Sequence, residues 1–240
     1  MKKLASFLIF IILFFSACNL GHDQKSTLRY RVLENKKTIE DTTFYKILKN
    51  YPEFITDDEE LKSSLNILNQ AVVNFVDTIE LFYWGTNVEG AKQVKNETGA
   101  AGVFELLNKY TIHDTTNQFI SIQFETYSYA LGAHGFTGLN TFNFDLNDGK
   151  FLQLKDVIDF SKPENLITLN VFLQKNFINP DSCFNNQPSV TPDFKRFGMS
   201  REFLYFYFEA YELGAYYCGS ATVKVPVEQI KSAGLWIFGK

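Results

Sequence analysis

The stretch Tyr127–Gly149, YSYALGAHGFTGLNTFNFDLNDG, decides the fold expected for this chain. It has the pattern of the end of one strand, a glycine-rich connection, a second strand and a tight turn. Phe142, Phe144 and Leu146 alternate with polar residues, as expected of a half-buried strand. Asn147–Gly149 then ends this strand, because these residue types tolerate the left-handed conformations of a tight turn. The sequence therefore predicts a hairpin around which the rest of the chain can be arranged.

The first strand of the hairpin begins near Phe119 and changes its pattern part of the way along. Ile120, Ile122 and Phe124 point to one face, and after Thr126 the large residues occupy the other parity. A shift of one residue exchanges the two faces of a strand. We therefore expect either a bulge near Thr126 or a twist that exposes the second face.

The connection between the two strands contains three glycines and one histidine. Gly132, Gly135 and Gly138 indicate positive φ angles or a close approach of the backbone. His134 is a candidate ligand or base, because histidine titrates near neutral pH. The alternative, which we favour, is that its ring hydrogen-bonds the backbone and braces the loop. The acidic turn that follows lacks EF-hand spacing and a closing glutamate, so no metal site is expected there.

The first residues of the chain are typical of a bacterial export signal. Lys2 and Lys3 precede an apolar run, Leu4–Phe15, which is too short to span a bilayer comfortably. Cys18 follows two small residues and resembles the lipidated cysteine of a bacterial lipoprotein box, although phenylalanine stands where that box usually has leucine. The alternative is an ordinary secretory signal with an incidental cysteine.

A lipidated Cys18 would hold the protein on a membrane without spanning it. Asn19 follows, and by resemblance to the bacterial sorting rule this favours the outer membrane; we expect a lipid-anchored protein of the cell envelope. The chain is expected to have three parts: a signal peptide over residues 1–17, a lipidated tether over 18–26 and one domain over 27–240. The alternative divides the domain into an N-terminal part, 27–131, and a C-terminal part, 132–240.

Composition and charge narrow the class of partner. The chain has 240 residues and a formal net charge of −4, and it has no basic patch, so nucleic acid is not an expected partner.

Cys183 and Cys218 remain after Cys18 is assigned to lipid, and they can pair in an oxidising compartment. The sequence leaves this pairing open, because nothing in it brings the two together. No cofactor is expected, since no third ligand of suitable spacing accompanies these cysteines.

Helices are expected mainly in two places. The first opens at Asp57 and has a continuous apolar stripe at spacings of three and four. The second begins near Pro163 and ends before Pro180. A short helix over 91–97 and a further helical piece over Val103–Tyr110 are also expected. The stripe of the first helix comprises Leu61, Leu65, Leu68, Val72, Phe75, Ile79 and Phe82.

Strands are expected over residues 27–33, in the hairpin, over Phe203–Phe208 and over 221–225. Phe203–Phe208, FLYFYF, is apolar on both faces, as a central strand covered on both sides would be. Residues 45–54 stay ambiguous, although Pro52 argues against a helix. Helices and strands mix without regular βαβ alternation. The predicted class is therefore α+β, an antiparallel β-sheet with amphipathic helices packed on it.

Two segments carry a family resemblance: residues 127–158, YSYALGAHGFTGLNTFNFDLNDGKFLQLKDVI, and residues 204–230, LYFYFEAYELGAYYCGSATVKVPVEQI. They resemble an extracytoplasmic domain family of largely unknown function. It occurs in the lysozyme-sensing anti-sigma factor RsiV and in the non-catalytic part of the peptidoglycan deacetylase PdaC. The resemblance covers roughly 28–235 and implies an envelope binding module. The chain lacks the paired-histidine motif of a metal-dependent deacetylase, so that activity is not expected to transfer.

The favoured hypothesis is a membrane-anchored, non-catalytic binding module for a cell-wall component or an envelope protein, a lysozyme-like protein included. The alternatives are a hydrolase acting on peptidoglycan or glycan, and a structural assembly lipoprotein. No Gly-x-Ser-x-Gly, Ser-x-x-Lys or His-Glu-x-x-His motif is present. His134 with Glu212 is the one acid–base pair worth testing. The expected contact residues supply contact area and a polar tip: Tyr127, Tyr129, His134, Tyr211, Tyr216 and Tyr217.

Overall fold

The computed structural model of the chain describes residues 28–41, 43–83, 89–99 and 101–239. The expected signal peptide, Cys18 and all of the tether lie outside these residues. Within the described ranges, no helix combines the length and the apolar character that crossing a bilayer requires.

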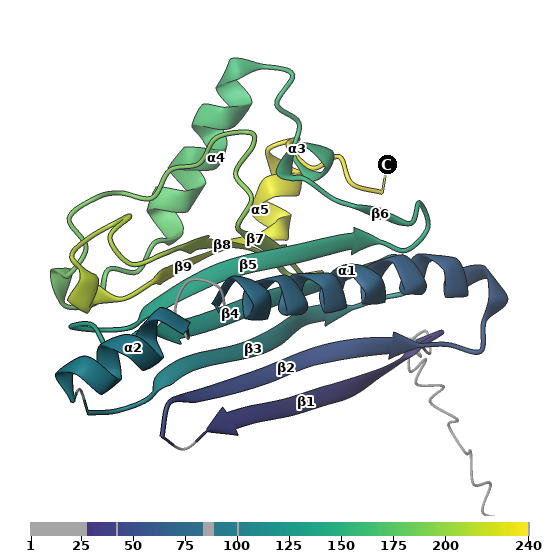
Figure 1. Cartoon of the computed structure of the whole chain (residues 1–240). Helices are drawn as coiled ribbons and strands as arrows, with labels where there is room; N and C mark the ends of the chain where they lie inside the picture. The colour runs from purple at the N-terminus through teal and green to yellow at the C-terminus, as the bar shows by residue number, and fades with distance from the viewer. Residues whose placement is uncertain (1–27, 42, 84–88, 100, 240) are drawn as a thin grey trace, which may run out of the picture.

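Six strands form the larger sheet, in which they lie side by side in sequence order (Figure 1). All neighbours are antiparallel except β2 and β3, which run parallel and are joined through α1 and α2. This arrangement confirms the α+β class. The strands are β1 (Arg31–Asp41), β2 (Tyr45–Ile55), β3 (Phe104–Thr115), β4 (Phe119–Tyr129), β5 (Phe136–Asp145) and β6 (Lys150–Phe151), and the two helices are α1 (Glu59–Tyr83) and α2 (Glu89–Thr98).

Helix α1 lies along one face of this sheet, as the apolar stripe predicts (Figure 1). Asp58 caps it: its carboxylate accepts a hydrogen bond from the backbone N–H of Glu60 at 3.0 Å. Phe82, expected in the stripe, is instead 70% exposed, and Val76 is buried in the core. The expected stripe has an average spacing of 3.5 residues, so its offset from the 3.6 residues of a helical turn accumulates and is largest at the end of the helix. The core residues that α1 contributes are Leu61, Leu65, Leu68, Val72 and Val76.

The sheet is covered on both faces at β4, which explains the change of parity in its sequence. Ile120, Ile122 and Phe124 pack under α1. Phe119, of the opposite parity, belongs to the core of the second sheet. The pairing of Thr126 with both neighbouring strands is regular, so the bulge considered at Thr126 is not present. The irregularity in this sheet lies instead on β3, between Ile112 and Asp114.

A smaller antiparallel sheet packs against the other face and carries its own helices. It comprises β7 (Phe197–Met199), β8 (Phe203–Phe208) and β9 (Ala221–Pro226), with β8 in the middle. Even-numbered residues of β8 join the core under α4 (Pro163–Asn176) and α5 (Val227–Ser232). The odd-numbered Tyr205 and Tyr207 stack on His113 of β3. The prediction of a central strand covered on both sides is confirmed.

A buried polar network joins the two sheets. The hydroxyl of Ser121 on β4 donates to the side-chain oxygen of Asn143 on β5 at 2.7 Å. The amide nitrogen of Asn143 donates to the backbone carbonyl of Phe197 at 2.7 Å, and the backbone N–H of Met199 donates to Ser121 Oγ at 2.9 Å. Ser121 is therefore a buried residue of the junction, although the alternating pattern predicts an outward position.

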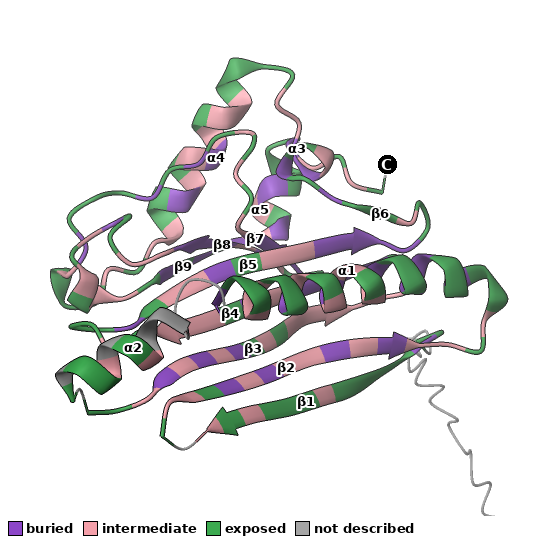
Figure 2. Cartoon of the chain, viewed as in Figure 1, coloured by how far each residue is buried: buried purple, intermediate pink, exposed green. Residues whose placement is uncertain are grey.

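Two further expectations need correction. Val103–Tyr110, expected to be helical, forms part of β3 and pairs with β2 and β4. Pairing between segments distant in the sequence overrides a weak local helix preference here. The first strand begins at Arg31 rather than near residue 27, and it continues to Asp41. Figure 2 shows that β1 is largely exposed, in contrast to β2 and β5. Because so little of β1 is buried, the polar second half of this strand has no alternating apolar pattern.

The β5–β6 turn, the short helix α2 and the helix that begins at Pro163 agree with the sequence. Gly149 has a φ of 61° in the turn between β5 and β6, as the Asn-Asp-Gly sequence predicts. Leu154–Val157 forms the single-turn helix α3. α4 ends at Asn176, before Pro180. These elements depend on local turn and capping chemistry, which the sequence carries directly.

Candidate functional site

Four of the expected contact residues come together where the β4–β5 connection meets the segment between β8 and β9. His134 stacks on Tyr216, with ring centroids 3.8 Å apart, and the Tyr211 ring lies 5.5 Å from that of Tyr216. Tyr217 is 83% exposed and Tyr211 is 59% exposed. We call His134, Tyr211, Tyr216 and Tyr217 the tyrosine patch.

Gly135 allows this arrangement through close packing against Tyr127. A Cβ atom at Gly135 would overlap the Tyr127 ring, and Gly135 has no positive φ angle. The carbonyl of Gly135 accepts a hydrogen bond from the Tyr216 hydroxyl at 2.6 Å. The expected close approach is therefore present at Gly135. It is absent at Gly132 and Gly138, and neither of these has a positive φ angle. The positive φ of this connection belongs to Leu131, at 58°.

The loop that carries Tyr211 is held by a network of charged residues. Arg196 forms an ion pair with Glu212, and its Nη1 lies 3.8 Å from Glu209. Glu209 accepts a hydrogen bond from the backbone N–H of Leu139 on β5 at 2.8 Å. Tyr211 itself has a φ of 75°, a strained conformation for a residue with a side chain. Strain of this kind persists only where the surroundings impose it, and it occurs often at binding sites.

A disulfide fixes the other side of the patch. Cys183 and Cys218 are bonded, with Cα atoms 5.7 Å apart. Cys218 directly follows Tyr216 and Tyr217 in a short 3-10 helix. The sequence left this pairing open, and the structure places the two cysteines together. A disulfide-bonded domain is consistent with an extracytoplasmic protein.

A pocket of about 300 Å³ lies beside the patch, between β4, β5 and the segment after β8. Its lining includes Tyr216 and Tyr217 together with Glu125 of β4 and Thr137 of β5. Glu125 is exposed, and the sequence did not identify it as a site residue. The sequence does carry a signal for Glu125: its parity in β4 is opposite to that of Ile120, Ile122 and Phe124, which pack under α1. The pocket can accept hydrogen-bonding groups or a positive charge.

Hydrogen-bonding groups lie within the tyrosine patch and beside it. Burial, together with the nearby Glu105, Tyr216 and Tyr129, raises the pKa of Tyr127, so its hydroxyl stays protonated. His134 Nδ1 lies 3.0 Å from the carbonyl of Gly135, its neighbour in the chain. His134 Nε2 lies 3.5 Å from the Tyr211 hydroxyl. The ring of His134 therefore contacts a carbonyl and two phenols, as the bracing role predicts.

Tyr129 stands apart from this arrangement, and Glu212, the proposed acid–base partner of His134, is engaged by other groups. Tyr129 lies on the same face of β4 as Tyr127, and its carbonyl accepts a hydrogen bond from the Tyr83 hydroxyl at 3.0 Å. Glu212 is engaged by Arg196 and by the backbone N–H of Glu209. Among the described residues, no group of three or more His, Cys, Asp or Glu side chains is placed to hold a metal ion.

Two solved structures of DUF3298 family proteins are similar in fold to this chain. A DUF3298 family member from Bacteroides fragilis is similar to this chain with a TM-score of 0.60 and 17% identity, over 85% of this chain and 92% of that one. A DUF3298 family protein from Pseudomonas aeruginosa gives a TM-score of 0.57 and 15% identity, over 88% and 94%. At these identities the likeness concerns the fold.

Sequence comparison adds a match to one family model. Residues 38–137, from β1 to the start of β5, match the family model described as Deacetylase PdaC. Peptidoglycan-N-acetylmuramic acid deacetylase PdaC of Bacillus subtilis (strain 168) is 27% identical over 133 residues, which cover 53% of this chain and 28% of that protein. The chain thus spans less than a third of this curated relative. The resemblance to PdaC is confirmed over these residues.

Proposed function

We propose that this protein is a lipid-anchored, non-catalytic binding module of the bacterial cell envelope, which holds an envelope or wall-associated protein through the tyrosine patch. The observation that carries the proposal is the exposure of Tyr211 and Tyr217, at 59% and 83%, on loops fixed by a disulfide and a network of ion pairs. Exposed tyrosines on a rigid support supply contact area at a low cost in conformational entropy.

The charge around the patch favours a basic partner. Glu125 is exposed at the rim of the adjoining pocket, and its carboxylate has no ion pair with any residue that the structure describes. A negative group beside exposed phenols complements lysines and arginines on a partner, which steers association and suppresses wrong partners. A basic, lysozyme-like protein is therefore the first partner to test. A cell-wall fragment seated in the 300 Å³ pocket is the alternative ligand.

Binding to immobilised full-length chain, purified in mild detergent, tests this proposal. Lysozyme, soluble peptidoglycan fragments and an envelope extract serve as analytes. We expect saturable binding of a basic protein that the double variant Tyr211→Ser/Tyr217→Ser weakens at least about tenfold, the loss expected when central contact tyrosines are truncated. Ile167→Ser, a change at a 64% exposed apolar residue on α4, is the matched control. Equal binding by both variants would refute a role for the patch.

The lipid anchor is tested separately, because it concerns Cys18 and not the folded domain. The expected result is that the native chain fractionates with membranes and that Cys18→Ser moves to the soluble fraction, since one thiol carries the anchoring lipid. Membrane fractionation of Cys18→Ser would rule out lipidation at this residue and leave the binding proposal untouched.

An enzymatic role on peptidoglycan is the second hypothesis. It is favoured by the similarity to a protein that is named as a peptidoglycan-N-acetylmuramic acid deacetylase. Incubating the chain with purified peptidoglycan, and assaying released acetate and reducing ends, tests it directly. Product formation that Glu212→Gln and His134→Gln both abolish would favour catalysis over recognition.

A further inference from the structure

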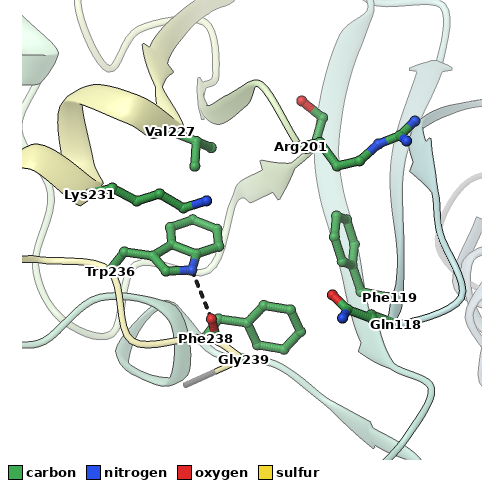
Figure 3. Close-up of a pocket in the computed structure, with 9 residues that line it drawn as sticks. Gln118, Phe119, Arg201, Val227, Lys231, Trp236, Phe238 and Gly239 are labelled. Atoms are coloured by element: carbon green, nitrogen blue, oxygen red, sulfur yellow. Dashed lines mark hydrogen bonds between the residues drawn. The ribbon is translucent and has the colours of Figure 1, made fainter. Parts of the chain in front are cut away.

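A second pocket lies at the opposite end of β4 from the tyrosine patch, about 30 Å away along the strand. Its volume is about 450 Å³. Four segments converge on it: the start of β4, the β7–β8 turn, α5 and the chain after α5. Figure 3 shows Lys231 and Trp236 on one side of this space and Phe119 on the other. The pocket is separate from the tyrosine patch and shares no lining residue with it.

The apolar part of the pocket is an aromatic wall held in place by the fold. The Trp236 indole N–H donates to the backbone carbonyl of Phe238 at 2.8 Å, which fixes the orientation of the ring (Figure 3). The Phe238 ring packs edge-on against Phe119, with centroids 5.9 Å apart. Trp236 and Phe238 are both partly buried, so each also presents surface to the pocket. Walls of this kind pack against the flat face of a ring.

The polar part of the pocket centres on one lysine. Lys231 Nζ lies 5.5 Å from the centroid of the Trp236 ring, and in Figure 3 the ammonium points into the open space. No carboxylate forms an ion pair with Lys231 anywhere in the described ranges. Arg201, at the rim, is by contrast bonded to Asp114 through Nε at 2.9 Å and Nη2 at 3.2 Å. Lys231 is therefore the cation that is available to a ligand.

We propose that this pocket binds a small ring compound that carries a carboxylate. Lys231 takes the carboxylate, and Trp236 with Phe238 packs against the ring. A carboxylate close to an ammonium that is held over an indole gains a charge-assisted hydrogen bond. The side-chain amide of Gln118, on the far side, is positioned to serve a hydroxyl or acetamido group of the same ligand. The proposal depends only on this pocket, and not on the tyrosine patch.

Two pairs of probes distinguish the contribution of the carboxylate to binding from that of the ring that carries it. N-acetylmuramic acid and N-acetylglucosamine share a sugar ring and differ in a carboxylate-bearing substituent, while benzoate and benzyl alcohol make the same comparison on an aromatic ring. The full-length chain in mild detergent is titrated with each, and the indole N–H signal of Trp236 is followed by NMR. Trp236→Phe assigns that signal, since the chain has two tryptophans.

We expect saturable binding of at least one acid, with its neutral counterpart at least tenfold weaker. Lys231→Gln should remove this difference, whereas Lys175→Gln, the same change at an exposed lysine of α4, should keep it. Preference for N-acetylmuramic acid over benzoate identifies a sugar acid, and the reverse identifies an aromatic acid. The proposal is overturned if neither acid shifts the indole signal, or if Lys231→Gln binds the acids as the native chain does.

Discussion

At the scale of single residues, Gly135 shows how one backbone position sets the shape of a binding surface. Its Cα lies against the Tyr127 ring, and its carbonyl holds the Tyr216 hydroxyl at 2.6 Å. Any side chain at this position must displace Tyr127 and, through it, the loop that carries His134. The glycine is needed here for space and not for a positive φ angle.

Gly135→Ala should therefore lower the free energy of unfolding by about 1–3 kcal/mol, the usual effect of overpacking a well-packed site. Gly132→Ala is the matched control in the same loop, because a Cβ there meets nothing within 4 Å. Urea unfolding of both variants measures the difference. In a Tyr127→Ala background the cost of Gly135→Ala should largely disappear, and a cost that persists would show that the ring is not the cause.

His113 is a second residue whose role the structure reveals. It lies on the irregular part of β3, stacks on Tyr205 at 4.3 Å and bonds the Tyr207 hydroxyl. Burial, and to a smaller extent Lys224, lowers the pKa of His113 from 6.5 to about 4. The folded protein therefore keeps this ring neutral at pH values where the unfolded chain protonates it.

Stability should fall as the pH drops below 6.5, because the unfolded state then binds a proton that the folded state refuses until about pH 4. Between pH 7 and pH 5 this coupling amounts to about 2 kcal/mol. Urea unfolding of the native chain and of His113→Gln at the two pH values isolates it, since other groups contribute equally to both. A pH dependence unchanged in His113→Gln would contradict this assignment.

At the scale of elements, the disulfide has the clearest consequence. It closes a loop between residues 35 apart in the sequence and supports the short helix that carries Tyr216. A cross-link of this length restricts the unfolded chain and stabilises the folded state by about 3–4 kcal/mol in the chain-entropy account.

Cys183→Ser/Cys218→Ser should lose about 3–4 kcal/mol in urea unfolding. It should also lose binding at the tyrosine patch, because Tyr216 and Tyr217 precede Cys218 directly. A reducing agent added to the native chain should reproduce the loss of stability and leave the double variant unaffected. Equal stability with and without reductant in the native chain would show that the bond contributes nothing.

The elements also show what the sequence could and could not predict. α1, α4, the β5–β6 turn and the covered strand β8 depend on periodicity and turn chemistry, and the sequence identified all of them. The sequence predicts a helix over Val103–Tyr110, because Phe104–Thr115 has no clean alternation. Pairing with two distant strands defines this segment as β3. The sequence proposes the patch residues only by their type, and their contact depends on two loops about 80 residues apart, as the Gly135–Tyr216 hydrogen bond at a separation of 81 shows. No local pattern carries that information.

At the scale of the whole molecule, two hydrophobic cores lie on opposite faces of one sheet, and the polar junction between them determines how they sit together. In this junction, the hydrogen-bonding groups of Ser121 and Asn143 are satisfied by each other and by the backbone of β7. The tyrosine patch takes His134 from the larger sheet and Tyr216 from the segment next to the smaller one. The geometry of the patch therefore depends on the junction, although the two do not touch.

Asn143→Leu keeps the number and branching of the side-chain heavy atoms and removes both hydrogen bonds, which leaves the O–H donor of Ser121 and the Phe197 carbonyl unpaired in a buried site. The expected loss is about 2–3 kcal/mol, the usual cost of stranding buried polar groups. Asn140→Leu, at an exposed position on the same strand, should have little effect on stability. The two sheets should also lose their coupling, so that urea unfolding of Asn143→Leu, followed by near-ultraviolet and far-ultraviolet circular dichroism, gives transitions that no longer coincide. Coincident transitions at native stability would mean that the apolar contacts alone hold the two sheets in place.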